Sequence, residues 1–269
     1  MNLFPLIPLS IAVLFAFKLT LIYVLAVIYG HVKPVFPYIS DAGATHPEAA
    51  FFSILLFLEG ILIAIMGWIR YKQIRYIVHN MPKPNENNNS LTIDENKLTK
   101  ITKYNKQGLY LQIAVMLSVA MVAAFRSTEH LEIHLIFGAF PAFIASIWYF
   151  YIQTWTSYQF IPTVNSIFVA RFRLFCSVLA IIFGTIMILS ISITWFDVTL
   201  PYSEIRGPPR LWWDEKTGGY IGHVVSAVNE NLMIFMMSPF YASFVCEFRR
   251  IHSHNGRLKF TFNDNVQSV

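Results

Sequence analysis

The chain has few charged residues and almost no cysteine. Lys, Arg, Asp and Glu make up 13% of its 269 residues, whereas a soluble domain carries about a quarter. The two cysteines, Cys176 and Cys246, lie far apart in the sequence and form no C-x-x-C pair. This spacing indicates neither a disulfide framework nor a zinc-finger site.

Apolar residues take the place of the missing charges. They make up 55% of the chain, and a few apolar runs are close to 20 residues long, which is the length that spans a bilayer core as a helix. We predict an all-α polytopic membrane protein with one domain, 1–269, and an extramembrane loop over 70–107. No small-residue cleavage site follows the first run, so we expect a retained helix there. The six predicted helices cover about 9–29, 49–69, 108–125, 131–151, 174–194 and 222–244.

Several motifs of common chemistry are also missing. We find no Ser-His-Asp order, no Gly-rich phosphate loop and no surface of interleaved basic and aromatic residues. The net charge of +5 is no nucleic-acid signal, because its meaning depends on the side of the membrane that the charges occupy. We therefore expect no nucleic-acid partner, no metal and no cofactor, and nothing in the sequence requires an enzyme.

The basic residues predict the orientation in the membrane. If both termini are cytosolic, 14 Lys and Arg residues lie on the cytosolic side and five on the opposite side, which matches the positive-inside bias. The sequon Asn88-Asn89-Ser90 is then cytosolic and is expected to stay unglycosylated. The opposite side holds Lys33, Arg126, Arg206, Arg210 and Lys216, and the cytosolic side holds Arg70, Lys72, Arg75, Lys83, Lys97, Lys100, Lys103, Lys106, Arg171, Arg173, Arg249, Arg250, Arg257 and Lys259.

The loop between the first two helices contains an unusual cluster of turn-forming and acidic residues. Asp41 and Gly43 are typical of a turn. Pro47 followed by Glu48 predicts a helix start, because proline lacks the unpaired N–H and a carboxylate faces the positive end of the helix dipole. Together with Ser40, these residues predict a loop held against a membrane helix on the lumenal or extracellular side. A structural role is the simplest interpretation, and a functional role is the alternative.

Two oppositely charged residues lie at similar depth in neighbouring helices. Lys18 and Glu59 are each about 15 Å from the lumenal ends of their predicted helices, at 1.5 Å per residue. Helices joined by a short loop usually pack side by side. We therefore hypothesise an intramembrane ion pair between them. The alternative is that Lys18 extends to the interface and Glu59 is protonated.

The sixth helix carries the polar sequence Asn229-Glu230-Asn231, about 12 Å below the lumenal surface. Both asparagines can donate hydrogen bonds to neighbouring helices, and the group can act simply to hold helices together. The alternative is a polar cavity that opens to the lumen and holds a lipid headgroup or a proton.

Two histidines, His130 and His134, are four residues apart on one helix face, a spacing that can bind a metal. Glu132 between them points to the other side, so the segment is not the H-E-x-x-H pattern. A lumenal pH response is a second interpretation, since histidine changes charge between neutral and lysosomal pH. Ordinary interfacial histidines are the simplest interpretation.

The cytosolic loop carries basic residues at a three-residue spacing. These are Lys97, Lys100, Lys103 and Lys106, and they can attract anionic phospholipids of the cytosolic leaflet at about 1 kcal/mol per residue near the surface. A solvated loop explains the same pattern equally well.

An ordered set of short motifs resembles the DRAM (damage-regulated autophagy modulator) family, within the FRAG/DRAM/SFK group of six-helix membrane proteins. The motifs occur in the family's order at the helix boundaries and cover nearly the whole chain. One departure is Asn231, where the family typically has Trp. The matching pieces are Pro37-Tyr38-Ile39-Ser40-Asp41-Ala42-Gly43 with Pro47-Glu48, Arg70-Tyr71-Lys72-Gln73, His134 with Gly138-Ala139, Gln153-Thr154, Ser157-Tyr158-Gln159, Ser226-Ala227 with Glu230, and Glu247-Phe248.

The resemblance implies a protein that modulates autophagy or membrane-lipid organisation. We expect a non-enzymatic multi-pass protein that modulates autophagy at lysosomal or endosomal membranes. The alternative is a phospholipid-organising protein at the plasma membrane, and a more distant one is a metal-dependent lipid hydrolase that uses the lumenal histidines. The expected partners are membrane lipids, together with proteins that the sequence does not identify.

Overall fold

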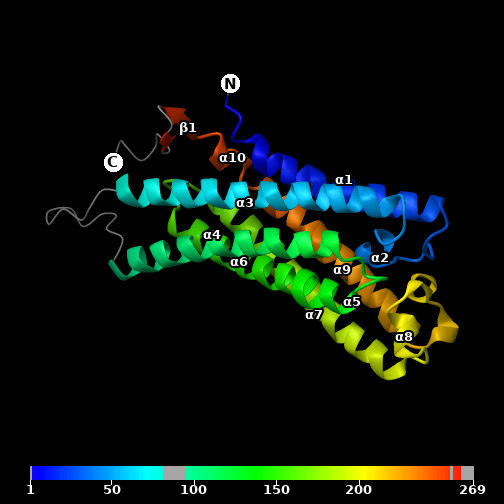
Figure 1. The fold of residues 1–269 in the computed structure, drawn as a ribbon. Helices are drawn as coiled ribbons and strands as arrows, with labels where there is room; N and C mark the ends of the chain where they lie inside the picture. The colour runs from blue at the N-terminus through cyan, green and yellow to red at the C-terminus, as the bar shows by residue number, and fades with distance from the viewer. Residues whose placement is uncertain (1, 81–94, 255–256, 262–269) are drawn as a thin grey trace.

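The protein is a bundle of long helices (Figure 1). The computed structural model describes residues 2–80, 95–254 and 257–261. Within these residues, six helices are long and apolar enough to cross a membrane, so the predicted all-α membrane fold is confirmed. They are α1 (Leu6–Ile28), α3 (Glu48–Asn80), α4 (Glu95–Ala124), α5 (Leu131–Ile133) continuing through the π-helical η1 (His134–Ala139) into α6 (Phe140–Gln159), α7 (Ile167–Asp197), and α9 (Tyr220–Ala242) followed by α10 (Val245–Phe248).

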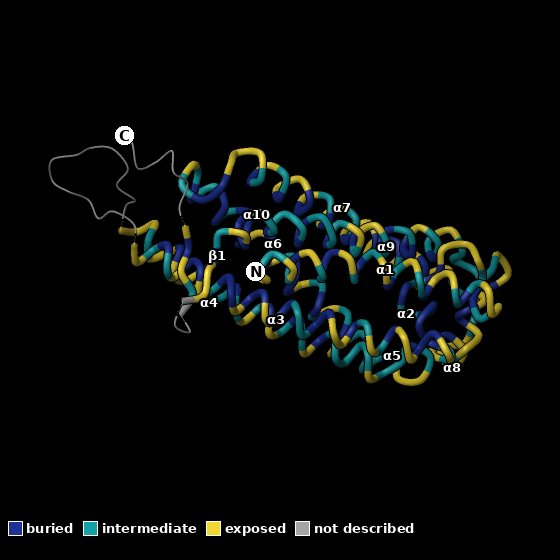
Figure 2. The backbone as a smooth tube through the Cα atoms, turned by 90° about the horizontal axis from the view of Figure 1, so that it is seen from above, coloured by how far each residue is buried: buried dark blue, intermediate teal, exposed yellow. Residues whose placement is uncertain are grey.

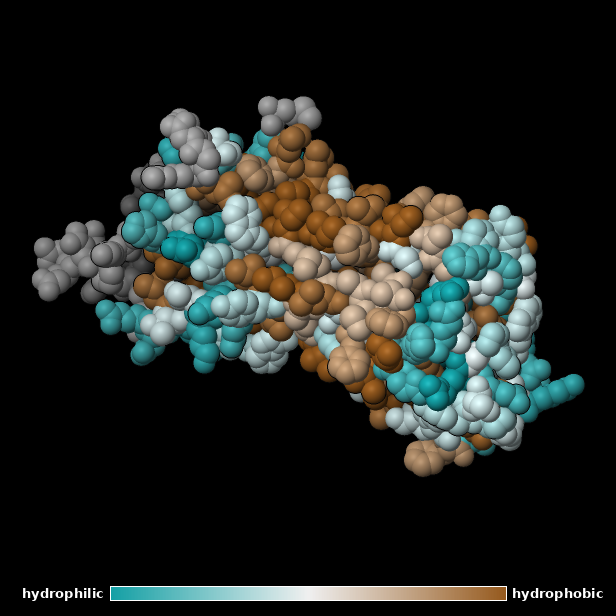
Figure 3. All heavy atoms as spheres, in the orientation of Figure 1, coloured by the Kyte–Doolittle hydropathy of each residue, from teal (hydrophilic) through white to brown (hydrophobic). Residues whose placement is uncertain are grey.

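The six spans form a closed ring. Helix α1 packs against α3, α3 against α4, α4 against α6, α6 against α7, α7 against α9, and α9 returns to α1. Large apolar side chains such as Phe168, Ile144 and Phe196 are exposed on the outside, and Figure 3 shows apolar side chains around the middle of the bundle with hydrophilic ones gathered at its ends. An apolar outer surface of this kind is what a lipid environment requires. In Figure 2 the buried residues of the helices face the inside of the bundle.

The two ends of the bundle differ in what covers them. One end, here called the terminal end, holds the start of α1, the end of α3, the start of α4, and the hairpin of β1 (Ile251–His254) and β2 (Arg257–Phe260) (Figure 1). The opposite loop end is covered by four short helical segments. These are α2 (Ile39–Ala42), α8 (Tyr202–Ile205), η2 (Pro208–Trp212) and η3 (Glu215–Thr217).

Several helices are longer than the hydropathy predicts. The predicted extramembrane segment over 70–107 is helical over much of its length. Helix α3 continues to Asn80 and α4 already begins at Glu95. Lys, Gln and Arg are good helix formers, so a helix can continue after its apolar stretch has ended. Helix α6 likewise extends to Gln159, and α7 starts at Ile167. The sequon Asn88-Asn89-Ser90 lies outside the described residues.

The β1–β2 hairpin was not predicted. Its strands pair antiparallel, with Ile251 opposite Phe260, and both of these side chains are buried. Asn2 donates a hydrogen bond from Nδ2 to the Ile251 carbonyl at 2.9 Å. The hairpin therefore connects the two ends of the chain at the terminal end of the bundle.

Candidate functional site

The segment between α1 and α3, residues 29–47, folds over the loop end of the bundle, and we call it the cap. Asp41 is 2% exposed and lies 2.7 Å from Nη2 of Arg210 in η2, and the Ser127 hydroxyl donates to the same carboxylate oxygen at 3.0 Å. Ser127 also contacts the Ser40 carbonyl at 3.2 Å. Three chain segments far apart in sequence therefore meet at one buried carboxylate.

The other residues of this loop fix its path. Gly43 is required because an added Cβ would lie 2.6 Å from the Phe52 ring. Pro47 directly precedes α3, which begins at Glu48 as predicted. The Glu48 side chain is fully buried, and its Oε1 lies 2.6 Å from Nδ1 of His31.

Glu230 of α9 contacts the backbone of the cap. Its Oε2 accepts a hydrogen bond from the Ile39 N–H at 2.8 Å, at the start of α2. Asn231 donates to the Pro37 carbonyl at 3.3 Å and to Ala227 of its own helix at 2.8 Å. Asn229 donates to the Val225 carbonyl of its own helix at 2.7 Å.

Aromatic rings pack beside Glu230 under the cap. The His223 ring stacks on Trp213 with centroids 4.5 Å apart, and Tyr38 meets the same histidine edge-on at 5.0 Å. Burial raises the pKa of the Tyr38 phenol well above its usual range. The phenol is therefore a neutral hydrogen-bonding group at any physiological pH.

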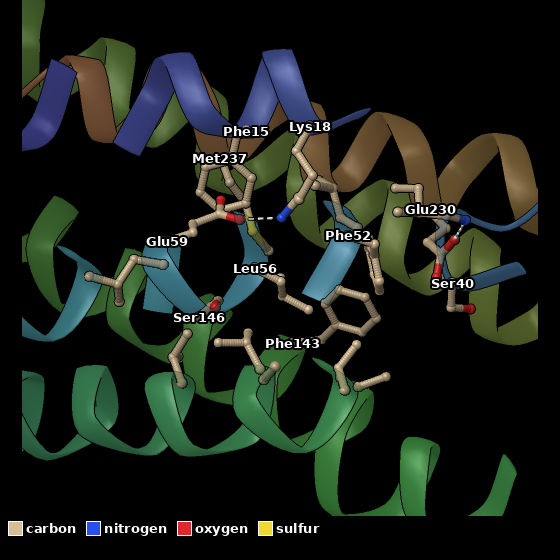
Figure 4. A pocket seen from close by; sticks show the side chains of 18 of the residues that line it. Phe15, Lys18, Ser40, Phe52, Leu56, Glu59, Phe143, Ser146, Glu230 and Met237 are labelled. Carbon is tan, nitrogen blue, oxygen red and sulfur yellow. Dashed lines mark hydrogen bonds and ion pairs between the residues drawn. The ribbon is translucent and has the colours of Figure 1, made fainter. Parts of the chain in front are cut away.

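Two cavities meet at Glu230. The first, of about 80 Å³, lies inside the bundle and is mostly apolar, with Phe52, Leu56 and Phe143 among its lining residues (Figure 4). The second, of about 100 Å³, lies between η1–α6 and α7 under Arg210 and His223. Apolar cavities of roughly 150 Å³ stay dry and hold small hydrocarbons. Residues that line both cavities are Ser40, Ala139, Phe143 and Glu230.

The predicted ion pair between Lys18 and Glu59 is present at the far side of the first cavity (Figure 4). The two side chains are 4% and 1% exposed. Lys18 also lies over the Phe15 ring, with Nζ 5.1 Å from the ring centroid. A buried charge without its partner costs several kcal/mol, so this pair joins α1 and α3 firmly.

A second charged centre lies at the terminal end. Arg70 contacts the Glu247 carboxylate and donates from Nε to Gln153 at 2.9 Å, while Arg173 lies 2.7 Å from the other Glu247 oxygen. Arg173 also donates to the Ser157 hydroxyl at 2.6 Å. We call these residues the arginine network: Arg70, Arg173, Glu247, Gln153 and Ser157.

The motif Arg70-Tyr71-Lys72-Gln73 lies within α3, so its side chains point to different faces of the helix. Arg70 and Gln73, three residues apart on one face of α3, are buried and bonded to each other at 2.7 Å. Lys72 is exposed and lies over Trp68, with Nζ 5.7 Å from the ring centroid. The Tyr71 carbonyl accepts from Asn105 of α4 at 3.0 Å. Only two of the four motif residues therefore reach the arginine network.

The side chains of His130 and His134 do not converge on one point. His134 Nδ1 lies 2.7 Å from the Phe125 carbonyl, while the His130 ring packs edge-on against the Phe125 ring at 5.8 Å. Glu132 faces away from both and contacts Tyr202 and Arg206. Among the described residues, no group of three or more His, Cys, Asp and Glu side chains is placed to hold a metal ion.

Sequence reasoning missed the partners of these carboxylates. Arg210 and Arg173 were assigned only to a side of the membrane, and Glu247 only to a motif, although all three residues are buried. Arg173 lay one residue outside the predicted fifth helix, whose start the apolar run placed too late. The position of Arg173 directly before an apolar run was the sequence feature that could have indicated a buried arginine.

The fold and its buried charges define a multi-pass α-helical membrane protein with a capped loop end. Residues 3–251 match the family described as "Frag1/DRAM/Sfk1/Cwh43P N-terminal domain", and the chain belongs to this family. The resemblance that the motifs indicated is therefore confirmed.

Several curated relatives are similar over most of the chain. "DNA damage-regulated autophagy modulator protein 2" of Mus musculus is 30% identical over 236 residues, which cover 85% of this chain and 78% of the relative. "DNA damage-regulated autophagy modulator protein 1" of Homo sapiens is 27% identical over 229 residues, covering 85% and 84%. "Modulator of macroautophagy TMEM150B-A" of Xenopus laevis is 30% identical over 142 residues, covering 52% and 51%. No solved structure matches the chain.

Proposed function

We propose that this protein modulates autophagy from a lysosomal or endosomal membrane, with both termini in the cytosol and without catalysing a reaction. The names of its relatives support a role in autophagy. The excess of Lys and Arg at the terminal end supports the orientation. In this orientation the cap faces the lumen.

One observation carries the non-enzymatic part of the proposal: the carboxylates of the loop end hold the fold together. Asp41 contacts Arg210, Glu48 contacts His31, and Glu230 accepts from the backbone of α2. A general acid or base must instead reach a proton of a bound substrate. These groups stabilise the cap, so we infer that the protein acts through its conformation and its contacts.

The first experiment images the tagged protein at native expression against lysosomal and plasma-membrane markers. We expect it on lysosomes or endosomes. In parallel, autophagic flux is measured in cells that lack the protein and in cells that express it again. Residence only at the cell surface, together with unchanged flux, would overturn the proposal.

A second candidate function is phospholipid handling, and the two cavities that meet at Glu230 favour it. The rim of the second cavity includes Phe140 and Trp195, which are 40% and 46% exposed on the outer surface of the bundle. A hydrocarbon chain could therefore pass from the surrounding lipid between η1–α6 and α7. The combined volume suits part of one acyl chain, not a whole phospholipid.

Filling the cavities tests this second candidate. Ala139→Phe would place a ring in both cavities, whereas Ile136→Phe in the same segment would enlarge a side chain that is already 56% exposed. The measurement is the amount of phosphatidylserine on the outer surface of intact cells. We expect Ala139→Phe to behave like deletion of the protein and Ile136→Phe like the native chain. Equal behaviour of the two variants would exclude a role for the cavities.

A further inference from the structure

A third cavity lies at the terminal end, away from the capped site. It has a volume of about 320 Å³ and lies between the α6–α7 connection and the end of α9 with α10. Its polar lining residues are Asn165, Ser166, Ser243, Glu247 and Arg250. At about 30 Å³ per water, it can hold roughly ten water molecules or a small polar headgroup.

The wall of this cavity has an excess of positive charge. Behind it lie Arg70 and Arg173, which are 1% and 0% exposed and share the single carboxylate of Glu247. One nitrogen of Arg70 has no hydrogen-bond partner among the described residues. Arg250 lines the same cavity, so three guanidinium groups and one carboxylate lie at or behind its wall and leave two formal positive charges. An anion in the cavity would offset this excess, because buried charges are stable only when they are paired.

Two positively charged groups lie directly at the cavity wall, namely the Arg250 guanidinium and the N-terminus of α7. Arg250 donates from Nη1 to the Val164 carbonyl at 3.0 Å, which fixes its guanidinium at the cavity wall. The 31-residue helix α7 begins at the same wall, where Ser166 is its N-cap and accepts from the Val169 N–H at 3.3 Å. The N-terminus of a helix carries partial positive charge and free N–H groups that favour phosphate.

Asn165 indicates that the ligand of this cavity carries a hydrogen-bond donor as well as a negative charge. Its side chain is 2% exposed, and Nδ2 donates to the Ser157 carbonyl at 3.3 Å, but Oδ1 has no hydrogen-bond partner among the described residues. A buried acceptor without a donor costs about 1–3 kcal/mol. A ligand hydroxyl would satisfy it, whereas a phosphate oxygen would not.

We propose that this cavity binds a phosphate ester that also carries a free hydroxyl group. The phosphate lies between Arg250 and the N-terminus of α7, and the hydroxyl donates to Oδ1 of Asn165. Such a group occurs in the headgroup of an anionic phospholipid and in a free sugar or polyol phosphate. The cavity lies at the end of the bundle where the spans leave the membrane, so a lipid headgroup can reach it without leaving its leaflet.

The test measures binding to the purified full-length protein in a neutral detergent by thermal shift, with four probes. Dioctanoyl phosphatidylglycerol has both charge and hydroxyls, dioctanoyl phosphatidylethanol has the charge without a hydroxyl, and dioctanoyl phosphatidylcholine is zwitterionic. Glycerol 1-phosphate is the free phosphate ester. We expect phosphatidylglycerol to bind at least about tenfold more tightly than phosphatidylethanol, as for one buried hydrogen bond to a neutral acceptor, and phosphatidylcholine to bind most weakly.

The free probe distinguishes the two sources. Binding of glycerol 1-phosphate as tight as that of phosphatidylglycerol supports a soluble ester as the ligand, and much weaker binding supports a lipid. Equal binding of phosphatidylglycerol and phosphatidylethanol, or no binding of any anionic probe, would overturn the proposal.

Variants locate the site. Arg250→Gln should weaken phosphatidylglycerol binding at least about tenfold, because it removes a charge-assisted contact. Arg249→Gln, the neighbouring exposed arginine, is the matched control and should bind like the native protein. Val169→Phe fills the cavity without changing any charge and should also abolish binding. Native affinity in both Arg250→Gln and Val169→Phe would show that the probe binds elsewhere.

Discussion

The two charged centres of this molecule bury opposite excesses of charge. At the loop end, three carboxylates are buried (Asp41, Glu48 and Glu230), and of these Asp41 is paired with the buried Arg210. At the terminal end, two fully buried arginines share the single carboxylate of Glu247. The signs of these excesses follow the general distribution of basic residues along the chain, which places most Lys and Arg on the terminal side.

The centres also differ in what satisfies their charges. Loop-end carboxylates are held partly by backbone N–H and hydroxyl donors, as at Ile39 and Ser127. Glu230 also borders the two cavities of the loop end. In the arginine network, side chains mainly satisfy one another, with the Phe244 ring 3.6 Å from the Arg173 guanidinium. Because the side chains of the arginine network satisfy one another, the network tolerates little change in any one of its members.

The largest effect is expected midway between the two centres, where Lys18 and Glu59 pair. Glu59→Lys would place two ammonium groups together in a buried site and should destabilise the protein by at least about 3–5 kcal/mol. The double variant Lys18→Glu with Glu59→Lys should restore much of this loss. Folded protein is measured by size-exclusion chromatography of detergent extracts, with exposed Lys97→Glu as the control. Absence of rescue would show that the two residues do not act as a pair.

The second-largest loss of stability is expected in the arginine network, when its single carboxylate is removed. Glu247→Gln leaves Arg70 and Arg173 without a carboxylate, and we expect a loss of about 3 kcal/mol in the free energy of unfolding. Thermal unfolding of the purified protein measures it, and Glu95→Gln on the exposed start of α4 serves as control. A loss no larger than that of the control would mean that the network contributes specificity and not stability.

A smaller effect is expected at the cap. Asp41→Asn removes the ion pair with Arg210, but the amide oxygen can still accept from Ser127. Because Arg210 is 10% exposed and can recruit water, we expect a loss of about 2 kcal/mol. Thermal unfolding again measures it, with the exposed Glu204→Gln as control. Full retention of stability would show that the ion pair with Arg210 is not needed to hold the cap.

Much of this architecture follows from local sequence patterns. Apolar runs predict the six spans because each run must bury its backbone polar groups as a helix in the membrane. The Lys18–Glu59 pair follows from equal depth in adjacent helices, and the start of α3 at Glu48 follows from Pro47. In each case the evidence lies within one helix or between two consecutive ones.

The remaining contacts depend on segments far apart in the chain. Arg210 meets Asp41 across 169 positions of sequence, and Arg70 meets Glu247 across 177. No local pattern indicates which loop arginine folds over which carboxylate. The helix ends were also mislocated, since apolar content marks the edge of the membrane and polar helix formers continue beyond it, as in α3 to Asn80.

The smallest change in stability is expected at Glu230. This variant compares the loop end most directly with the arginine network. Glu230→Gln keeps an oxygen that can accept from the Ile39 N–H, so we expect a change below about 1 kcal/mol, in contrast to the same substitution at Glu247. Thermal unfolding of both variants makes the comparison. If autophagic flux or outer-surface phosphatidylserine nevertheless changes in Glu230→Gln, the carboxylate acts in function and not in folding. A loss as large as that of Glu247→Gln would instead make Glu230 a structural charge, and the loop end would resemble the arginine network.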